Sequence, residues 1–311
     1  MEAARARIAG KTRVTPVLTN AALDAAAGAH IFFKCENLQQ VGAFKARGAA
    51  NAVFALSDAE AAGGVATHSS GNHGAALAWA AGLRGVAAHV VMPRTAARPK
   101  LDQVERLGGR IVLCEPTLAA REAALARLVA ATGAVVVHPY DDPAVIAGQG
   151  VAALELLDEV PDLDLVVAPV GGGGLLSGTA VAVKGVRPAA RVVGAEPAAA
   201  DDAARSFHEG GLVPMTDPAT LADGLRAQLS ERTFAHIRRY ADDIVTVSED
   251  EIVLAMRALW EALKVVVEPS AAVAYAAIRA GKTQSRGLKV GVILTGGNVD
   301  LDRLPWAANL P

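Results

Sequence analysis

The sequence has too few cysteines and too little net charge for several classes of protein. Only two cysteines, Cys35 and Cys114, occur in its 311 residues. Two thiols are too few for a disulfide framework or a four-thiolate zinc site, so we expect both to be small buried hydrophobic residues. The formal net charge of −2 offers no basic surface to nucleic acid, and we expect no nucleic-acid partner.

An unbroken apolar run of membrane-spanning length is also lacking. Residues 165–183 carry no ionisable side chain, but Pro169 and five glycines divide them into a strand, a loop and a helix. This stretch therefore does not predict a membrane span. The N-terminus shows no apolar core segment of a secretory signal. We expect a cytoplasmic protein that has no membrane partner.

What the sequence does contain is an alternation of short β-branched runs with segments of helical length. Hydrophobic residues make up 52% of the chain and aromatic residues only 4%, so its apolar content is mostly Ala, Val and Leu. Strands that alternate with helices favour an α/β fold with parallel sheets, and apolar strands indicate that helices cover both faces. The predicted strands are residues 30–34, 64–67, 88–92, 110–114, 135–138, 165–168, 191–195, 243–247 and 290–294. The predicted helices are residues 44–56, 73–85, 119–132, 145–157, 175–186, 249–262 and 271–281.

A loop of four consecutive glycines follows one of these strands and precedes an apolar helix: Gly171, Gly172, Gly173 and Gly174. Glycine permits a positive φ and leaves no Cβ in the way of a ligand. The free amides and the dipole of the following helix favour an anion, so the loop predicts a phosphate cup. Lys45, far upstream in residues 42–48 (GAFKARG), suggests a phosphorylated cofactor held at both ends. The spacing of the loop matches neither G-x-G-x-x-G nor the P-loop.

Two further turns of small residues follow predicted strands, at residues 69–74 (SSGNHG) and 295–298 (TGGN). In open α/β sheets, ligands bind beyond the carboxyl ends of the strands. Any one of the three turns could be an ordinary strand–helix connection. Together they predict that one ligand-binding crevice is lined by all three.

Motifs of one known family occur along nearly the whole chain, at residues 32–39 (FFKCENLQ), 42–48, 67–74 (THSSGNHG), 144–150 (AVIAGQG), 171–174, 195–197 (AEP), 200–202 (ADD), 221–224 (LADG), 268–270 (EPS) and 295–300 (TGGNVD). In their order and spacing they resemble the fold-type II pyridoxal-phosphate enzymes, in particular the branch of serine racemases and serine/threonine dehydratases. The resemblance implies a two-domain α/β fold like that of the tryptophan synthase β subunit, with parallel-type sheets flanked by helices. It implies a large cofactor-binding domain of residues 1–53 and 145–311, a small mobile domain of residues 54–144, and a homodimer.

The resemblance also implies pyridoxal 5'-phosphate as the cofactor, bound to Lys45 through an internal Schiff base. A lysine reacts in this way only when deprotonated, which a partly desolvated pocket favours. Phe44 would pack against the pyridine ring, Asn72 would hydrogen-bond to the ring hydroxyl, and the Thr295 hydroxyl would face the pyridine nitrogen. The four glycines and Leu175 would form the phosphate cup. Without the family motifs, Lys45 would be interpreted as an exposed helix lysine.

Ser70 is the residue most diagnostic of reaction type. In the racemases of this family, the matching serine lies on the cofactor face opposite the lysine and acts as a second acid/base. Moving a proton from one face of Cα to the other requires two groups, and Lys45 and Ser70 would be that pair. The alternative is that Ser70 only hydrogen-bonds to amides of its own turn.

The same resemblance assigns substrate-binding residues in this turn and beyond it. Ser69, Asn72 and His73 match the loop that binds the substrate carboxylate. Arg121 matches an arginine that reaches the substrate in the racemases, and a guanidinium suits a carboxylate. Because Arg121 lies near the start of a helix rich in charged residues, a solvated surface arginine is the alternative.

A divalent-cation site is implied at Glu196, the carbonyl oxygen of Ala200, and Asp202. Ligands that are all oxygen suit Mg²⁺ or Ca²⁺. The alternative is that these acidic residues complement the dipole at a helix start. Two positions depart from the racemase pattern: Tyr140 stands where vertebrate-type racemases have asparagine, and Ala227 stands where they have serine.

We therefore predict a PLP-dependent enzyme that dehydrates and deaminates L-serine and L-threonine to a 2-oxo acid and ammonia, with serine racemase activity from Lys45 and Ser70. One alternative is an L-threo-3-hydroxyaspartate ammonia-lyase, whose substrate needs an extra cationic contact for its second carboxylate. A different alternative is a non-catalytic module that binds a cofactor or nucleotide. The predicted partner in either enzyme is a small amino-acid substrate.

Overall fold

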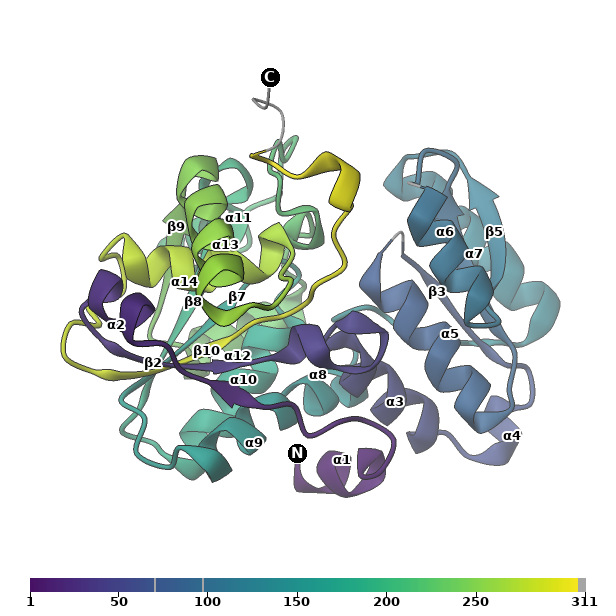
Figure 1. Cartoon of the computed structure of the whole chain (residues 1–311). Helices are drawn as coiled ribbons and strands as arrows, with labels where there is room; N and C mark the ends of the chain where they lie inside the picture. The colour runs from purple at the N-terminus through teal and green to yellow at the C-terminus, as the bar shows by residue number, and fades with distance from the viewer. Residues whose placement is uncertain (70, 97, 307–311) are drawn as a thin grey trace. The chain divides into compact units, whose positions relative to one another are not determined.

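The computed structural model describes residues 1–69, 71–96 and 98–306, and its contacts group them into two compact units (Figure 1). Unit 1 consists of residues 1–13 and 45–148, and unit 2 consists of residues 14–44 and 149 to the end of the described chain. One boundary therefore falls between Phe44 and Lys45. The predicted domains, residues 1–53 with 145–311 and residues 54–144, stay a prediction.

Unit 1 is built on a four-stranded sheet in the order β5-β4-β3-β6, with all pairs parallel. Its elements are α1 (Glu2–Ile8), α3 (Lys45–Ala55), α4 (Asp58–Ala61), β3 (Val65–His68), α5 (Asn72–Arg84), β4 (Ala88–Pro93), α6 (Arg98–Arg106), β5 (Arg110–Cys114), α7 (Leu118–Thr132) and β6 (Val135–Val136), with α8 (Pro143–Gln149) at its end.

Helices cover both faces of this sheet because neighbouring residues of β4 point in opposite directions. Val90 faces α5, where a Cβ built on Gly74 would lie 2.9 Å from the Val90 Cγ1 atom. Val91 faces the other side and belongs to a core that includes Ala124 and Leu125 of α7. Gly74 therefore permits the start of α5 to approach the sheet closely.

Unit 2 is built on a six-stranded sheet in the order β1-β2-β10-β7-β8-β9, in which only the edge pair of β1 and β2 is antiparallel. Its strands are β1 (Val17–Leu18), β2 (His30–Lys34), β7 (Leu165–Pro169), β8 (Arg191–Pro197), β9 (Asp243–Val247) and β10 (Lys289–Ile293). Its α-helices are α2 (Ala21–Ala27), α9 (Val151–Glu159), α10 (Gly174–Val186), α11 (Asp202–Glu209), α12 (Glu231–Tyr240), α13 (Glu249–Leu263) and α14 (Pro269–Arg279). Its 3-10 turns are η1 (Glu36–Leu38), η2 (Gln40–Gly42), η3 (Ala198–Ala200), η4 (Asp223–Leu225) and η5 (Leu301–Arg303).

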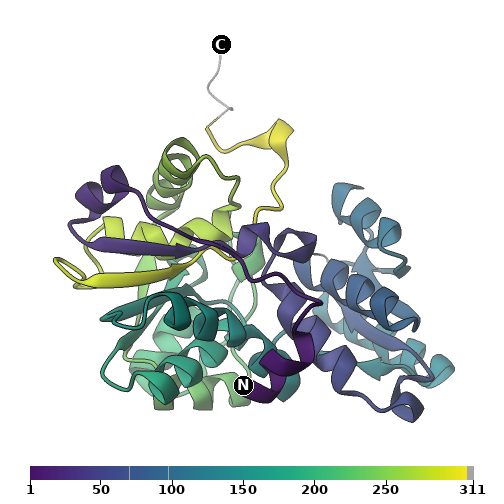
Figure 2. The ribbon, with the colours of Figure 1, turned by 60° about the horizontal axis from the view of Figure 1, so that its bottom comes forward.

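The sheet of unit 2 has α9 and α10 on one face and α13 and α14 on the other (Figure 2). Val167, Val193 and Val292 form a core with buried residues of α13 and α14. On the opposite face, a Cβ on Gly291 would lie 2.7 Å from Leu156 of α9, and one on Gly194 would lie 2.7 Å from Leu176 of α10. Glycine at these two positions lets the helices pack closely on the strands.

The predicted α/β class with parallel sheets and flanking helices is confirmed, and each predicted strand is present. Strand ends differ from the prediction by a residue or two, as is usual for element boundaries. The predicted helix 145–157 is wrong as one element. The chain forms α8 and α9 with a break at Gly150, because glycine weakens a helix. Within the described ranges, no helix has the length and apolar character needed to span a bilayer.

Candidate active site

The glycine-rich loop of unit 2 connects β7 to α10 at the carboxyl end of the strand. Gly173 is the N-cap of α10 and has a φ of +83°. A Cβ there would lie 2.7 Å from Leu229 Cδ2 and 2.9 Å from Thr233 Cβ, and one on Gly171 would lie 2.9 Å from the Leu225 Cα atom. Both positions therefore require glycine for steric reasons, and Gly173 also requires it for its positive φ.

The first turn of α10 has no hydrogen bond from a capping side chain at Gly173. Its first amides and the positive end of its dipole are thus available to an anion. The loop fits the phosphate of the predicted cofactor, with Leu175 in the first turn. That role for Gly171, Gly172, Gly173, Gly174 and Leu175 stays a prediction.

Phe44 and Thr295, which are far apart in the sequence, lie side by side in unit 2. The Phe44 amide donates to the Thr295 carbonyl oxygen at 2.9 Å, and Ala43 forms an antiparallel bridge with Gly296. Thr295 is 4% exposed and follows β10 closely. The predicted ring-packing residue and the predicted partner of the ring nitrogen are therefore held together by backbone pairing.

Lys45 is the first residue of α3 in unit 1 and is half-buried. Its Nζ atom donates to the carbonyl oxygen of Pro139 at 2.7 Å. Burial lowers the pKa of Lys45 from 10.5 to about 8, because removing water disfavours the charged amine. A lowered pKa is the property that a lysine needs in order to act as a nucleophile or base near neutral pH.

The turn between β3 and α5 contains the predicted carboxylate-binding residues. Ser69 follows β3, Gly71 is the N-cap of α5, and Asn72 and His73 begin the helix. The Gly71 amide donates to Ser69 Oγ at 3.4 Å. Ser70 lies outside the described residues. The first amides of α5 are suited to a carboxylate, but the roles of Ser69, Asn72 and His73 stay predictions.

His73 is buried and held as a neutral imidazole. Its Nε2 atom donates to the Val137 carbonyl oxygen at 3.0 Å, which leaves Nδ1 without a proton in the neutral ring. Burial, and secondarily the charge of Lys45, lower the pKa of His73 to about 3. His73 is therefore unsuited to carry a positive charge near neutral pH.

Two histidines that the sequence reasoning missed lie beside this turn in unit 1. His68 ends β3 and His138 follows the neighbouring strand β6, and their ring centroids are 6.0 Å apart. The His138 ring also meets the Tyr140 ring edge-to-face at 4.6 Å. The signal in the sequence was a histidine at the carboxyl end of each of two predicted strands, which are paired in the structure.

His138 has a fixed tautomer. Its Nδ1 atom accepts hydrogen bonds from the amides of Tyr140 at 3.3 Å and Asp141 at 2.9 Å, so the proton of the neutral ring is on Nε2. Burial and then the neighbouring His68 lower the pKa of His138 to about 4. His138 can thus donate one hydrogen bond from Nε2 without carrying charge.

Arg121 lies in the first turn of α7 and is half-buried. Its Nε atom donates to the Thr117 carbonyl oxygen at 3.4 Å. Burial and then the charge of Arg121 lower the pKa of His68, so the guanidinium is within electrostatic range of that imidazole. Unit 1 therefore places a cation near His68.

The predicted cation ligands lie together in unit 2, at the end of β8 and the start of α11. Glu196 is buried and accepts hydrogen bonds from the amides of Ala203 at 3.2 Å and Ala204 at 2.9 Å. Both carboxyl oxygens of Asp202 are buried, and no side chain among the described residues donates a hydrogen bond to them. Burial raises the pKa of Glu196 to about 9 and that of Asp202 to about 6. Two buried acids of this kind fit a cation that would compensate their charge.

Within the described ranges, no three or more His, Cys, Asp or Glu side chains form a cluster suited to a metal ion. The predicted site has only two such side chains, and its third ligand would be the Ala200 carbonyl oxygen. The cation therefore stays a prediction.

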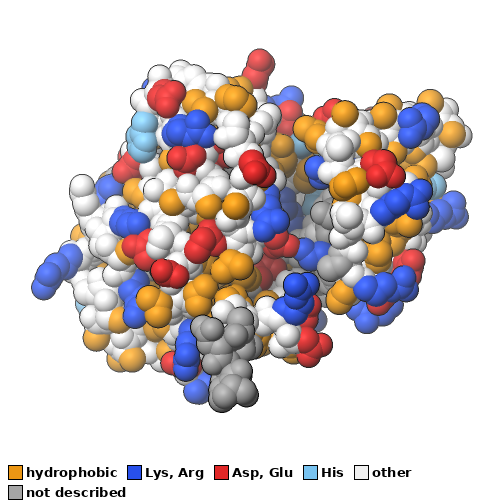
Figure 3. Space-filling view, turned by 90° about the horizontal axis from the view of Figure 1, so that it is seen from above, with side chains coloured by type: hydrophobic (Ala, Val, Ile, Leu, Met, Phe, Trp, Pro, Cys, Tyr) orange, Lys and Arg blue, Asp and Glu red, His pale blue; other side chains and the backbone are white. Residues whose placement is uncertain are grey.

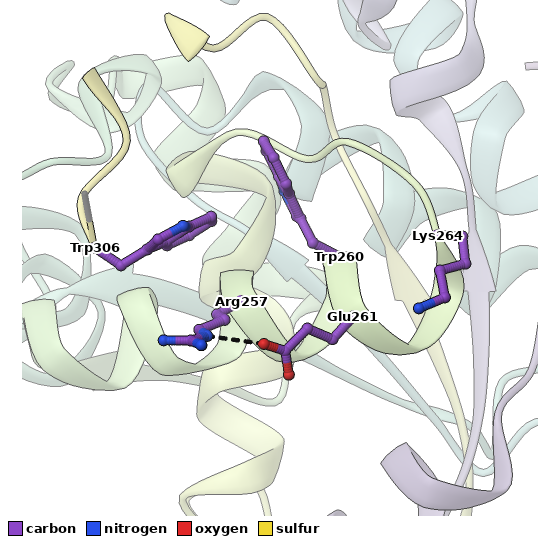
Figure 4. Close-up of a pocket in the computed structure, with 5 residues that line it drawn as sticks. All are labelled: Arg257, Trp260, Glu261, Lys264 and Trp306. Carbon is purple, nitrogen blue, oxygen red and sulfur yellow. Dashed lines mark hydrogen bonds and ion pairs between the residues drawn. The ribbon is translucent and has the colours of Figure 1, made fainter. Parts of the chain in front are cut away.

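A hollow of about 340 Å³ lies elsewhere in unit 2, beside α13 (Figure 4). It is lined by Arg257, Trp260, Glu261, Lys264 and Trp306, which are not among the predicted site residues. The Arg257 guanidinium is paired with Glu261 at 2.8 Å, and the two indoles meet edge-to-face at 5.3 Å.

On the face seen in Figure 3, acidic and basic side chains are interspersed.

Comparison with known proteins gives a family model and close relatives over nearly the full length. The model described as "Pyridoxal-phosphate dependent enzyme" matches residues 8–296. The chain is 52% identical to a beta-hydroxyaspartate dehydratase of Paracoccus denitrificans over 306 residues, which is 98% of this chain and 97% of the relative. The structure of maize serine racemase matches with a TM-score of 0.96 and 44% identity, covering 99% of this chain and 94% of that one. The structure of a threonine deaminase from T.th. matches with a TM-score of 0.92 and 42% identity, covering 96% and 97% of the two chains.

Proposed function

The chain belongs to the family of pyridoxal-phosphate dependent enzymes. We propose that it eliminates water from small β-hydroxy amino acids, and that hydrolysis of the unsaturated product with one water then releases ammonia and a 2-oxo acid. L-Serine and L-threonine are the proposed substrates, which accords with the named activities of the serine racemase and threonine deaminase neighbours. The observation that carries the proposal is Lys45, whose pKa of about 8 gives it the neutral amine that the chemistry requires.

The residues present fit pyridoxal phosphate. Lys45 would hold it covalently and Asn72 would bond to its ring hydroxyl, whereas Phe44, Thr295 and the 171–175 segment would bind the ring and the phosphate. The uncapped first turn of α10 and the glycines whose Cβ atoms would clash are the structural support for this assignment. When bound, the cofactor would supply an electron sink for the negative charge left at Cα.

The chain's own side chains would then bind, orient and move a proton. The first amides of α5, with Ser69 and Asn72, would bind the substrate carboxylate, and neutral His73 would line this turn without adding a charge. The Lys45 amine would remove the proton from Cα, because its lowered pKa leaves a substantial neutral fraction near pH 8. The β-hydroxyl group would then leave as water, taking the proton that Lys45 removed from Cα, while the electron pair left at Cα forms the double bond to Cβ.

Serine racemisation is proposed as a second outcome at the same site. It requires a group that returns a proton to the opposite face of Cα, and Ser70 is the residue proposed for that step. Support comes from the serine racemase neighbour and from the motif that contains Ser70.

A 3-hydroxyaspartate substrate is the second candidate, and one structural observation favours it. Such a substrate carries a second carboxylate, and Arg121 lies within electrostatic range of His68 in unit 1. The 52% identity to a beta-hydroxyaspartate dehydratase points the same way. Arg121 would bind the second carboxylate by a charged hydrogen bond, with His138 offering a neutral donor.

The finer features are proposals as well. We propose that Glu196, Asp202 and the Ala200 carbonyl oxygen bind Mg²⁺ or Ca²⁺, that the enzyme is a cytoplasmic homodimer, and that residues 54–144 move as a small domain. The burial of both carboxyl oxygens of Asp202 beside the buried Glu196 supports the cation.

A substrate panel tests the function. Purified enzyme would be given L-serine, D-serine, L-threonine and L-threo-3-hydroxyaspartate, with keto acid, ammonia and enantiomers all measured. The proposal expects keto acid from L-serine and L-threonine. A kcat/KM at least tenfold higher for hydroxyaspartate, lost in Arg121→Ala, would favour the second candidate. If no substrate releases keto acid or changes enantiomer, the chain is a non-catalytic member and the proposal is wrong.

A further inference from the structure

Two loops of unit 2 pair as a short ladder: residues 41–44, called the Phe44 loop, and residues 295–298, called the Thr295 loop. Lys45 directly follows the Phe44 loop in the sequence. The Phe44 amide donates to the Thr295 carbonyl oxygen at 2.9 Å, and the Gly297 amide donates to the Gly42 carbonyl oxygen at 3.0 Å. Between these bonds, Ala43 bridges Gly296. The ladder fixes the register of the Phe44 loop against the Thr295 loop.

The first of these loops contains a strained residue. Val41 has φ +55° and ψ 13°, and Gly42 follows with φ +71°. Glycine adopts a left-handed conformation readily, but a β-branched residue with positive φ is a genuine outlier and is strained. Such a conformation persists only where neighbouring contacts enforce it.

Asn298 supplies a contact that enforces this conformation. Its side-chain amide nitrogen donates to the Val41 carbonyl oxygen at 2.9 Å. Its Oδ1 atom lies where a Cβ on Gly42 would approach to 2.7 Å, so the asparagine is packed directly against the turn. The Asn298 side chain of the Thr295 loop thus holds Val41, the strained residue of the Phe44 loop, by a hydrogen bond.

Glu268 in turn holds Asn298. This residue is 5% exposed and is the N-cap of α14. Its Oε2 atom accepts a hydrogen bond from the backbone amide of Asn298 at 3.2 Å, and its own backbone amide donates to the Gly296 carbonyl oxygen at 2.9 Å. The Thr295 loop is therefore anchored to the start of helix α14 by two hydrogen bonds.

We propose that Asn298 is a positioning residue that holds Val41 in its strained turn and thereby sets Phe44 and Thr295 as a fixed platform for the cofactor ring. This inference rests on the proposed function, since it takes the ring to bind at Phe44 and Thr295. Asn298 would act through these two residues. Without the hydrogen bond from Asn298, Val41 relaxes to negative φ and the ladder that aligns the Phe44 and Thr295 loops loosens.

The test compares Asn298→Asp, Asn298→Ala and the double variant Asn298→Ala with Val41→Gly. The aspartate keeps the size of the side chain and removes the amide donor. The double variant removes the strain, since glycine needs no external contact to stay at positive φ. Pyridoxal phosphate would be titrated into each cofactor-free full-length protein, and the pH dependence of the visible absorbance of the bound cofactor would be recorded with kcat and KM.

We expect both single variants to bind the cofactor at least tenfold more weakly, to shift the pH profile of its absorbance, and to lose kcat more than KM. Val41→Gly should restore most of the cofactor affinity in the double variant. Should Asn298→Ala fail to fold, the aspartate variant still decides the point.

Wild-type affinity and an unchanged absorbance profile in Asn298→Asp would overturn the inference while the proposed function stands. Weakened binding without rescue by Val41→Gly would also overturn it, since strain at Val41 would then not be what Asn298 opposes. If the wild-type protein binds no pyridoxal phosphate, the proposed function fails together with the inference.

Discussion

The Nζ atom of Lys45 donates a 2.7 Å hydrogen bond to the carbonyl oxygen of Pro139, a residue 94 positions later in the chain. Lys45 begins α3 and Pro139 follows β6, so this bond places the lysine at the carboxyl edge of the sheet of unit 1. His73 and His138 are close enough for the charge of Lys45 to lower the pKa of both imidazoles. The lysine thus lies near neutral rings, and its acceptor at Pro139 is an uncharged carbonyl group.

This environment predicts a pH-dependent stability. The native pKa of Lys45 is about 8, below its ordinary 10.5, so between these values the unfolded chain binds more protons than the native one. Stability of the cofactor-free protein should therefore rise with pH from about 8 to 10.5. Lys45→Met should lose that rise, as measured by urea midpoints across the range. The exposed Lys264, replaced by Met, is the matched control and should keep it. An identical slope in Lys45→Met would show that the lysine is not desolvated.

The glycine loop predicts a contrast between two alanine substitutions at the start and end of α10. Gly173→Ala places a Cβ at φ +83° against Leu229 and Thr233 and should cost about 1–3 kcal/mol of stability, with weaker phosphate binding. Gly185→Ala meets nothing within 4 Å and should be neutral or stabilising by about 0.4–1 kcal/mol. Chemical denaturation and cofactor titration measure both effects. Equal stability of the two variants would contradict the packing argument.

The proposed cation predicts a chelator-sensitive melting temperature. Binding to the native state alone raises stability by about 2.7 kcal/mol at a hundredfold excess over Kd. Mg²⁺ or Ca²⁺ should therefore raise the melting temperature of the wild-type protein, excess chelator should lower it, and Asp202→Ala should abolish the response. Asp201→Ala, which removes a surface pair with Arg205, should leave it intact. A melting temperature indifferent to chelator and metal would count against the site.

Ser70 predicts a separation of two activities. Ser70→Ala should remove serine racemisation and any reaction of D-serine, because a general acid–base group contributes about 10²–10⁴-fold. Elimination from L-serine or L-threonine should survive in part, since Lys45 acts on that face. Chiral product analysis beside a keto-acid assay measures both. A parallel fall in the two activities would instead mean that Ser70 positions the carboxylate-binding turn.

The sequence predicted the features that depend on local patterns. Apolar runs marked the strands, and the turn at Gly171–Gly174 between β7 and the body of α10 followed from the glycines themselves, although Gly174 is already the first residue of α10. The short antiparallel β1 was not predicted, because two residues carry no periodicity. The break at Gly150 was missed because the apolar pattern continues through it.

The contacts that sequence reasoning missed are made by residues far apart in the chain. His68 and His138 meet only because β3 and β6 pair, and the Val41 turn owes its conformation to Asn298. No local pattern predicts positive φ at a valine, since propensity strongly disfavours it. The catalytic roles of Lys45 and Ser70 were predicted from family motifs, and the substitutions of these two residues test them.

The most direct test of the central claim is the behaviour of Lys45→Ala loaded with pyridoxal phosphate. For the wild-type protein we expect a visible absorbance band from the bound cofactor and release of keto acid and ammonia from L-serine or L-threonine. In Lys45→Ala that band should be lost, and elimination and racemisation should both stop, because the covalent attachment and the base disappear together. Turnover by Lys45→Ala within tenfold of the wild-type rate would contradict the account and show that another residue does this work.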